Sequence, residues 1–417
     1  MPRFSGWPPR AVGYAAAAIA AVLAAPAWAQ TAPPYETLVE RLDDTPAAQE
    51  AEALNDAAQA RVRQARALPN PEISAEVENV NGQGPYRGFG AAETTYSINQ
   101  PLELFGQRGS RINAARAEAG AAGLRRDRAR IDAAARLALA YAEAEAAARR
   151  AEIAEEALSL VTAERRAADA LVASGREPAL RAIQAESEEA AASARLAEAR
   201  AERDAAFAYL SAIALLPAPV DAIAASLLER EPPAVGLHDG RDAPGVRLAE
   251  AESVASQRLV SVERARGRPD LSASVGVRRF EEIDTEAMTF GVTLRVPLFD
   301  RNGGAVAAAE AESRAARARA AAARLEAEAS ERGLHARRDA ATERAVAAER
   351  ARDAAAEAYR LTLTGYEAGR VSQLELRSTR IALLDAHNAL LDARLARVRA
   401  EVELARLEGR IPFGEAQ

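Results

Sequence analysis

Four short segments of the chain alternate apolar and polar residues. In the first, Ile73, Ala75 and Val77 alternate with polar side chains, and segments 96–99, 271–278 and 288–296 show the same alternation. A period of two predicts strands with one apolar and one polar face. Such strands suit a soluble, half-buried sheet, and at about nine residues they also suit a tilted outer-membrane sheet. Polar or glycine-rich links at 82–90 and 281–286 join the strands in two pairs.

Long proline-free stretches rich in alanine, glutamate and arginine follow the strand pairs. Residues 109–173 and 305–363 predict two helices, each about 90–100 Å long at 1.5 Å per residue. Shorter helices are predicted at 35–68, 178–211, 243–267 and 372–407. A return helix and a pre-strand helix together match one long helix in length. We therefore expect the two short helices to stack end to end beside the long one.

The order of these elements indicates an internal two-fold repeat. Residues 68–74, 100–109 and 174–176 resemble residues 268–272, 296–303 and 368–370, at offsets that fall from 198 to 194 residues. The predicted organisation is a first repeat at 30–211, a connecting segment at 212–242, a second repeat at 243–410 and a tail at 411–417. The connecting segment is rich in proline, and we expect it to form a partly ordered equatorial belt outside the helices.

Composition indicates how such helices pack. Alanine contributes roughly a quarter of the 417 residues and aromatic residues only 4%, so bulky side chains are too few to fill ordinary domains. Small side chains allow helices to approach closely, and alanine has a high helix propensity. We therefore expect long helices that pack closely through small residues, with almost no conventional core.

Charge and chemistry exclude several classes of function. Cysteine is absent, which excludes disulfides and cysteine nucleophiles. The net charge is −7 with both signs interspersed, which argues against a general nucleic-acid binder. The three histidines, His238, His335 and His387, have no partner at ligand spacing, so neither a metal site nor a cofactor is expected. No motif arranges serine, histidine and aspartate for catalysis, and we expect no enzyme.

The N-terminus predicts an export signal at 1–29. Arg3 and Arg10 precede an apolar stretch at 11–25, and Ala27-Trp28-Ala29 forms an A-x-A cleavage site before Gln30. A membrane anchor is the alternative, but the apolar stretch is too short to span comfortably. No other stretch is long and apolar enough for a transmembrane helix, so any membrane crossing must use the strands. Export and the absence of a partner core favour the membrane location for these strands.

Four strands cannot close a barrel, and open edges are not tolerated in lipid. If the strands cross a membrane, the chain must oligomerise. Two copies supply eight strands and three copies supply twelve, and geometry alone does not choose between them. Phe105 and Phe299 follow the prolines that close the strand pairs, and these aromatic residues mark either a membrane interface or an apolar strand-to-helix junction.

Three sequence runs resemble the TolC family of outer-membrane efflux channels, in order, over nearly all of the mature chain. They are Asn-Pro-Glu-Ile at 70–73, Asn-Gln-Pro-Leu-Glu-Leu-Phe-Gly-Gln-Arg at 99–108, and Tyr-Glu-Ala-Gly-Arg-Val-Ser-Gln-Leu-Glu-Leu at 366–376. The run at 100–108 is similar to the heavy-metal cation efflux branch, although Gln107 stands where that branch commonly has lysine. The second copy lacks a full Gly-Gln-Arg.

The resemblance implies a mainly α fold with a small β part. Long antiparallel helical hairpins would form an α-barrel across the periplasm, and four strands per chain would contribute to a twelve-stranded trimeric β-barrel in the outer membrane. The implied function is a passive exit duct that works with a periplasmic adaptor and an inner-membrane RND-type pump, for heavy-metal cations. A drug efflux channel of the same fold is the alternative.

Candidate site residues follow from the strands and, by resemblance, from the turns. The polar strand faces would line the pore, or would be ordinary surface, at Glu72, Glu76, Glu78, Arg278 and Arg295. The resemblance places adaptor contact at Ser174, Gly175, Arg176, Gly369 and Arg370. It places the periplasmic aperture at Tyr366, Arg370, Ser372 and Glu375. Glycine at each turn also permits the left-handed backbone of a helix cap.

Two other readings compete with the channel. A periplasmic adaptor also uses export and a helical hairpin, but it has one hairpin with β-rich domains, whereas here the hairpin is duplicated. A coiled-coil scaffold needs sustained heptads with bulky seam residues, and it does not explain the alternating strands.

Overall fold

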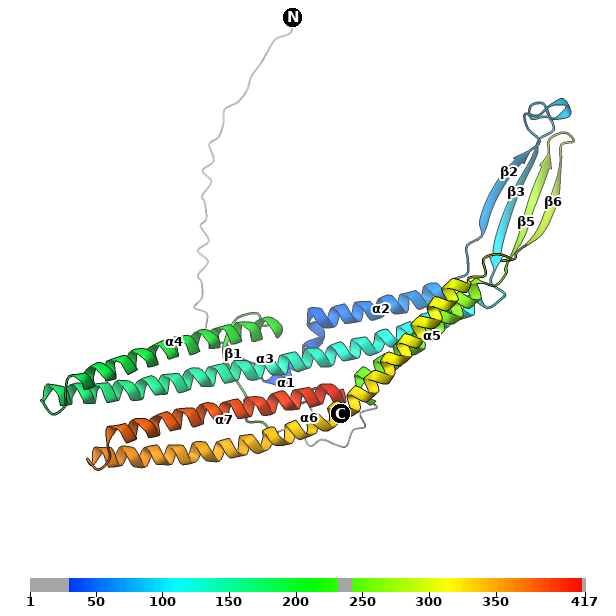
Figure 1. The fold of residues 1–417 in the computed structure, drawn as a ribbon. Helices are drawn as coiled ribbons and strands as arrows, with labels where there is room; N and C mark the ends of the chain where they lie inside the picture. The colour runs from blue at the N-terminus through cyan, green and yellow to red at the C-terminus, as the bar shows by residue number, and fades with distance from the viewer. Residues whose placement is uncertain (1–29, 232–241, 415–417) are drawn as a thin grey trace, which may run out of the picture.

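The computed structural model describes residues 30–231 and 242–414 of the 417-residue chain. The predicted signal at 1–29 and His238 lie outside these residues, as does the end of the predicted tail. The described chain is a long helical rod with a β-sheet at one end (Figure 1). The predicted class, mainly helical with a small β part, is confirmed.

Two long helices run the length of the rod. Helix α3 spans Gln107–Ala173 and α6 spans Gly303–Glu367, which are 67 and 65 residues. At 1.5 Å per residue each is about 100 Å long. Most of their buried positions are alanine, because neighbouring helices approach along narrow seams. The two long helices predicted from the sequence are confirmed, within a few residues at each end.

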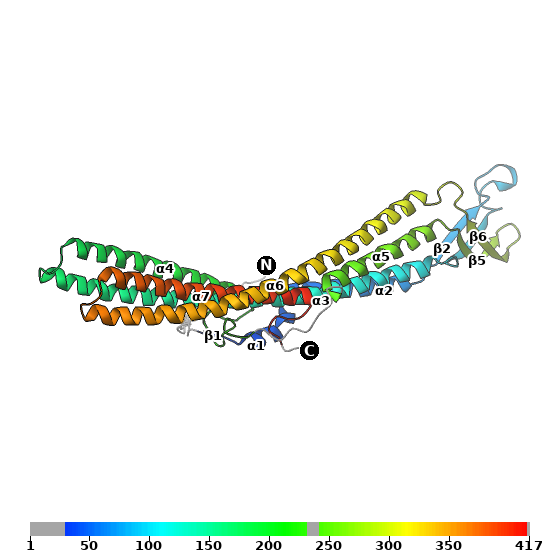
Figure 2. The same ribbon diagram turned by 60° about the horizontal axis from the view of Figure 1, so that its bottom comes forward.

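The four short helices lie in pairs on the long ones (Figures 1 and 2). Helices α2, Pro46–Arg66, and α4, Leu180–Ile213, pack along opposite halves of α3. Helices α5, Pro244–Arg266, and α7, Gln373–Glu408, do the same along α6, and both also contact α3. As expected, the short helices lie one after the other along the long ones, and α5 and α7 meet at their ends, but α2 and α4 do not contact each other.

The first predicted helix, at 35–68, is wrong as a single element. The structure has α1 at Tyr35–Glu40, a 3₁₀ turn at Leu42–Asp44, and then α2. Proline cannot occupy a helix interior, and Pro46 begins α2 instead. The Thr45 hydroxyl accepts from the Ala48 N–H at 3.4 Å as the N-cap.

The sheet joins both strand pairs in one antiparallel array. Strands β2 (Glu72–Glu78), β3 (Glu93–Leu102), β5 (Asp270–Phe280) and β6 (Thr285–Arg295) are neighbours in that order. The central row pairs Ile73 with Ile98, Ile98 with Val275, and Val275 with Phe290. Strands β2 and β6 form the two open edges of the sheet within the described chain.

The described part of the connecting segment is bound to the side of the rod. Strand β4, Val220–Ile223, pairs in parallel with β1, Gln30–Ala32. These strands are too short for the alternation of apolar residues to predict them. Beyond β4, the Tyr141 hydroxyl donates to the Ala225 carbonyl at 2.9 Å, and Arg397 donates to the Leu228 carbonyl at 2.7 Å. The segment is therefore an ordered belt against the middle of the rod. We call this region, around Tyr141 of α3 and Arg397 of α7, the waist.

The waist also contains a true hydrophobic core, so the expectation of almost no conventional core is wrong there. Tyr35, Leu137, Tyr141 and Leu210 are at most 2% exposed. Helices α4 and α7 add Phe207, Leu391 and Leu395, and the segments outside the long helices and their four short partners add Leu38, Leu42, Leu227, Leu228 and Phe413. Bulky residues concentrate where the belt adds a second layer to the helical wall, since only a second layer can bury them.

A buried glutamate on α3 holds the belt in place, and we expect its loss to release the belt. Glu145 is 4% exposed and accepts from the N–H groups of Leu227 and Leu228 at 2.8 and 3.1 Å. Glu145→Ala leaves these donors unsatisfied and should lower the free energy of unfolding by about 2–3 kcal/mol. Urea unfolding measures the loss, and hydrogen exchange should accelerate at residues 226–231.

The matched control for this prediction is Glu143→Ala, two residues away on the same helix. Glu143 makes an exposed ion pair with Arg399 at 3.1 Å, and exposed pairs contribute about 0–1 kcal/mol. Equal losses in the two variants, or unchanged exchange in the belt, would contradict the assigned role of Glu145.

A second buried carboxylate, Glu401, predicts a pH dependence. It is fully buried, and Arg410 donates to it at 2.6 Å while also pairing with Glu408 at 2.6 Å. Burial raises the pKa of Glu401 above its ordinary value of 4.5, against the lowering effect of Arg410. Between these two pKa values the folded chain holds more protons than the unfolded chain, so stability falls as pH rises through that window.

Glu401→Gln removes this contribution, while Arg410 keeps Glu408 as a partner. We expect the variant to gain stability relative to the wild type as the pH is raised from roughly 4 to roughly 7. Urea unfolding at a series of pH values measures the difference, and a difference independent of pH would refute the prediction.

Candidate functional site

The sheet has one apolar and one polar face. Alternation and register place the exposed large apolar side chains of all four strands on one face, led by Ile73, Phe290 and Val292 at 80%, 77% and 74% exposure. The other members of this face are Val77, Tyr96, Ile98, Val275, Val277, Met288 and Leu294. An apolar patch of this kind marks a surface that another apolar phase or partner covers.

The five strand residues predicted to line a pore all lie on the opposite, polar face. Glu72, Glu76 and Glu78 share one side of β2, and the cross-strand row from Glu76 through Thr95 reaches Arg278. Arg295 lies on the same face at the end of β6, where Asp270 is its cross-strand neighbour in the register. The register thus brings the predicted set together on one surface, while its role in conduction stays a prediction.

Ion pairs organise the end of this polar face that lies away from the rod. Arg278 contacts Glu78 at 3.2 Å and Glu93 at 3.1 Å, and it donates to the Thr95 hydroxyl at 3.0 Å. Glu93 was not among the predicted residues. It lies at the start of β3, where the sequence alternation does not separate strand from loop.

The two predicted turns lie together at the end of the rod opposite the sheet (Figure 1). Gly175 and Gly369 have φ of +73° and +69°, so the expected left-handed caps are confirmed. Each turn is closed by two backbone hydrogen bonds of the same pattern. In the first turn, the Gly175 N–H donates to the Val172 carbonyl at 2.9 Å and the Arg176 N–H donates to the Leu171 carbonyl at 3.0 Å. The side chains of Ser174, Arg176 and Arg370 are exposed at this end.

The predicted aperture residues lie beside the second turn. The Ser372 hydroxyl accepts from the Glu375 N–H at 3.3 Å, so Ser372 is the N-cap of α7 and Glu375 occupies its first turn. An acidic residue in the first turn stabilises a helix. Tyr366 is half-buried and Arg370 exposed. These contacts explain Ser372 and Glu375 locally, and the aperture assignment stays a prediction.

A buried ionic cluster that was not predicted from the sequence links the two helical hairpins near the turns. Arg380 on α7 is 4% exposed and pairs with Glu164 on α3 at 2.5 Å and Glu188 on α4 at 3.2 Å. Burial raises the pKa of Glu164, with Arg380 opposing the shift. Its spacing in the sequence could have indicated that Arg380 is buried. Arg380 lies four residues after Leu376 and three before Leu383, on the buried stripe of α7.

The sequence run at 100–108 makes structural contacts at the neck, where the helices meet the strands. Arg108 donates to the Arg66 carbonyl at 2.7 Å, and Arg111 donates to the Ala65 carbonyl at 3.2 Å. These arginines satisfy carbonyls that the end of α2 leaves open. Gln107 donates to the Pro269 carbonyl at 3.2 Å and so ties the two halves of the chain together.

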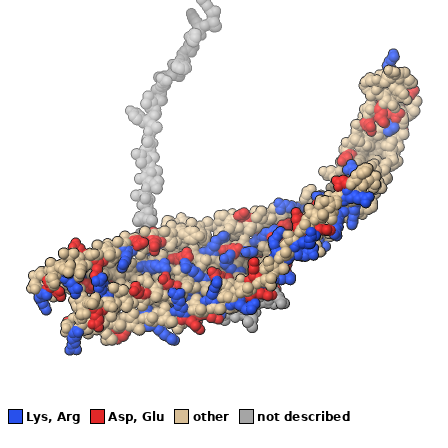
Figure 3. Space-filling model, in the orientation of Figure 1, with Lys and Arg blue, Asp and Glu red and all other residues tan. Residues whose placement is uncertain are grey.

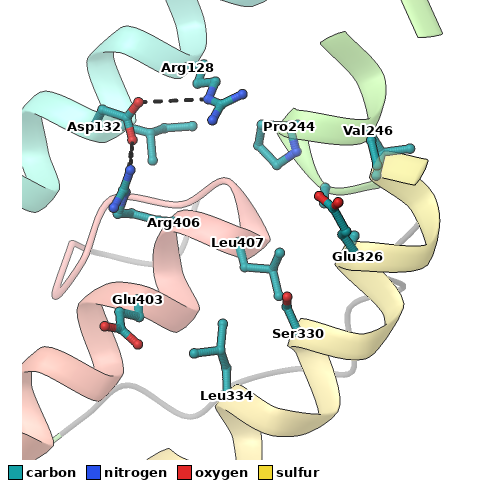
Figure 4. A pocket seen from close by; sticks show the side chains of 15 residues that line it. Arg128, Asp132, Pro244, Val246, Glu326, Ser330, Leu334, Glu403, Arg406 and Leu407 are labelled. Atoms are coloured by element: carbon teal, nitrogen blue, oxygen red, sulfur yellow. Dashed lines mark hydrogen bonds and ion pairs between the residues drawn. The ribbon is translucent and has the colours of Figure 1, made fainter. Parts of the chain in front are cut away.

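A cavity of about 520 Å³ lies where α5 begins and α7 ends (Figure 4). Asp132 pairs with Arg406 at 2.7 Å and with Arg128 at 3.8 Å on one side, and Glu326 and Ser330 of α6 lie on the other. The cavity is the gap between the ends of the two short helices that share α6.

The described residues contain no group of three or more histidine, aspartate or glutamate side chains suited to a metal ion. His335 and His387 each approach one glutamate, at 4.0 and 3.8 Å. Across 30–231 and 242–414, no helix is both long and apolar enough to cross a membrane.

Comparison with known proteins identifies the family. The profile of the family described as outer membrane efflux protein matches residues 38–214 and 241–410. The nickel-cobalt-cadmium resistance protein NccC of Alcaligenes xylosoxydans xylosoxydans is 38% identical over 93% of this chain and 89% of that protein. The nickel and cobalt resistance protein CnrC of Cupriavidus metallidurans is 41% identical over 72% of each chain. The chain therefore belongs to the outer membrane efflux protein family.

Solved structures agree in fold. A crystal structure of CusC matches with a TM-score of 0.77 over 90% of this chain and 92% of that one, at 18% identity. The outer membrane protein VceC of Vibrio cholerae matches with a TM-score of 0.74 over 90% and 96%, at 22% identity. The chain is an outer-membrane efflux channel with a helical extension into the periplasm, and it is not an enzyme.

Proposed function

We propose that three copies of this chain form a continuous exit duct. Their strands would close a twelve-stranded barrel in the outer membrane, and their hairpins would form a helical tunnel across the periplasm. The observation that carries the proposal is the sheet itself, with an exposed apolar face suited to lipid and a polar face suited to a water-filled lumen.

The edges of the sheet support closure by further copies. In the order β2-β3-β5-β6 all neighbours are antiparallel, so β2 and β6 run in opposite directions. The β2 edge of one copy can therefore pair antiparallel with the β6 edge of the next while both polar faces stay inside. Closure removes the two open edges, which lipid would not tolerate.

The polar face also fits the inside of a curved sheet. A Cβ atom at Gly276 would lie 2.5 Å from the Tyr96 carbonyl oxygen, and one at Gly291 would lie 2.6 Å from the Ser274 hydroxyl. Side-chain space is thus scarce on this face, as expected where a sheet curves toward it.

We propose heavy-metal cations as the substrate class. NccC and CnrC, described above, are named for nickel, cobalt and cadmium resistance. The polar face of each copy carries Glu72, Glu76, Glu78, Glu93 and Asp270 against Arg278 and Arg295. A lumen with excess negative charge attracts cations and raises their local concentration. A drug efflux channel of the same fold remains the alternative.

The partners proposed are a periplasmic adaptor and an inner-membrane RND-type pump, which would supply the energy. The turns at 174–176 and 369–370 would contact the adaptor, because they form the free end of the rod. The aperture would be formed at the same end by Tyr366, Arg370, Ser372 and Glu375, with no group in the duct required to catalyse a reaction.

Deletion of the gene tests the substrate. We expect lower tolerance to nickel, cobalt, cadmium or zinc, restored by the wild-type gene, with unchanged tolerance to organic drugs. Sensitivity to drugs alone would reject the metal proposal and leave the channel intact. A soluble periplasmic species in fractionation, in place of a heat-resistant trimer in outer membranes, would reject the channel assembly.

The double substitution Arg370→Ala and Glu375→Gln tests the aperture. We expect a change in single-channel conductance of the purified protein, because charged side chains at a constriction set its local field and width. Arg344→Ala, an exposed position on the side of α6, is the control. Conductance equal to that of the control would reject the aperture assignment.

A further inference from the structure

Several exposed arginines lie at the neck. We name Arg63, Arg66, Arg108, Arg268 and Arg301 the arginine collar; all five are exposed. They belong to the end of α2, the start of α3, the link between α5 and β5 and the residues before α6, which together make up the neck. Figure 3 shows basic side chains gathered there.

Backbone contacts bring these positions together around the neck. Arg108 donates to the Arg66 carbonyl at 2.7 Å, and Arg268 donates to the Phe105 carbonyl. The backbone of Arg301 is so close to Gly267 that a Cβ atom there would lie 2.5 Å from the Arg301 carbonyl oxygen. The collar is therefore one surface assembled from four parts of the chain.

The charge of the collar is not neutralised within the described chain. Neighbouring arginines have acidic partners: Arg111 pairs with Glu103, and Arg264 with Glu310. No carboxylate of residues 30–231 or 242–414 lies within ion-pair distance of a collar guanidinium. A surface that gathers five unpaired guanidinium groups in a chain of net charge −7 favours an anionic partner.

The opposite end of the sheet differs in sign. The turn between β5 and β6 carries Glu281, Glu282 and Asp284. The adjacent Arg279 pairs with Glu281 at 3.1 Å and with Asp284 at 3.5 Å. Arg87, in the loop between β2 and β3, is the one arginine in the loops at that end, so acidic residues dominate there while arginines without acidic partners gather at the rod side of the sheet.

Exposed apolar residues adjoin the collar. Phe299 is fully exposed and lies two residues before Arg301, and Leu68, at 69% exposure, lies two residues after Arg66. Leu104, at 66% exposure, precedes Phe105, whose carbonyl accepts from Arg268. The surface therefore changes from apolar to cationic over a few residues, as it does where a protein leaves the hydrocarbon and enters the headgroup layer.

We propose that the collar binds the anionic phosphate headgroups of phospholipids in the periplasmic leaflet of the outer membrane. The guanidinium group can bind phosphate with two parallel hydrogen bonds. This inference rests on the proposed function, since it requires the sheet to cross the membrane. It adds a lipid-binding surface that fixes how deeply the sheet lies in the membrane and from which side of the membrane the rod extends.

The test uses the full chain purified in detergent and titrated with phosphatidylglycerol, with phosphatidylcholine as the zwitterionic comparison. The collar variant combines Arg63→Gln, Arg66→Gln and Arg301→Gln, which spares the two collar arginines that donate to backbone carbonyls. Bound lipid per chain is counted by native mass spectrometry. We expect the preference for phosphatidylglycerol to fall by about fivefold per arginine removed, on the order of 100-fold in all.

The matched control combines Arg337→Gln, Arg344→Gln and Arg350→Gln, three exposed arginines on the far half of α6 that form no ion pair with a carboxylate of the described residues. The control should keep the wild-type preference. Equal phosphatidylglycerol binding by the wild type and the collar variant would overturn the proposal. Displacement of the lipid by equimolar inorganic phosphate would also overturn it, in favour of a free-phosphate site. Single-channel conductance of the collar variant distinguishes failure of the lipid-binding proposal from failure of the proposed channel function. A variant that still conducts leaves the channel function intact.

Discussion

Replacing Arg380 by alanine should lower the free energy of unfolding by about 3–5 kcal/mol, a large loss for one side chain. Arg380 is 4% exposed and is the only described cation that contacts both Glu164 and Glu188, at 2.5 and 3.2 Å. Its removal leaves two carboxylates in a poorly hydrated seam without their shared partner. Because these residues lie on α7, α3 and α4, the two hairpins should separate more easily. Urea unfolding followed by circular dichroism measures the loss.

The pH dependence of this loss provides an internal check. Burial already raises the pKa of Glu164, and removal of the opposing arginine raises that pKa further. A proton can then neutralise the buried carboxylate in the variant, so the loss should be smaller at acidic pH than at neutral pH. Arg377→Ala is the matched control, because its pair with Glu188 at 2.9 Å is half exposed and contributes about 0–1 kcal/mol. Equal losses in both variants would refute the role of Arg380.

A positive charge at Phe290 should prevent assembly in the membrane. Phe290 is 77% exposed at the centre of the apolar face, beside Val275. An arginine at the middle of the hydrocarbon costs about 2–4 kcal/mol in each copy, and an assembly of three copies incurs that cost three times. We expect Phe290→Arg to eliminate the heat-resistant trimer from the outer-membrane fraction, as measured by unheated gel electrophoresis and blotting.

The control substitution is Thr293→Arg on the same strand. Thr293 is exposed on the polar face, opposite Ser272, where a charge stays in water. The trimer should persist in this variant. Equal trimer levels for the two substitutions would show that lipid does not cover the apolar face, and would remove the observation that carries the proposed function.

The helices and strands could be predicted from local patterns because each pattern reports directly on backbone geometry. Alternation at Ile73, Ala75 and Val77 has the period of a strand, and the long alanine-rich stretches have no proline to end a helix. The glycines of the turns were predicted because few other residues adopt positive φ readily. The break at Thr45-Pro46 was also readable in the sequence, as a cap followed by proline at the first helical position.

The waist and the ionic clusters could not be predicted in the same way. The partners of Glu145 are about 80 residues away, and Arg380 and Glu164 are 216 residues apart. The spacing of Arg380 from Leu376 and Leu383 places it on the packed stripe of α7, but local sequence does not identify the carboxylates that it contacts. Only the packing of α7 against α3 decides which arginines lose water, and only the belt decides where bulky side chains can be buried.

Local sequence thus determined the long helices, most of the short ones and the two faces of the four main strands, because these depend on interactions within a few residues. The tertiary structure decided the order of the strands in the sheet, the core at the waist and the arginines that remain unpaired at the neck. These depend on contacts between segments far apart in the chain, whose free energy is set by the burial that packing creates.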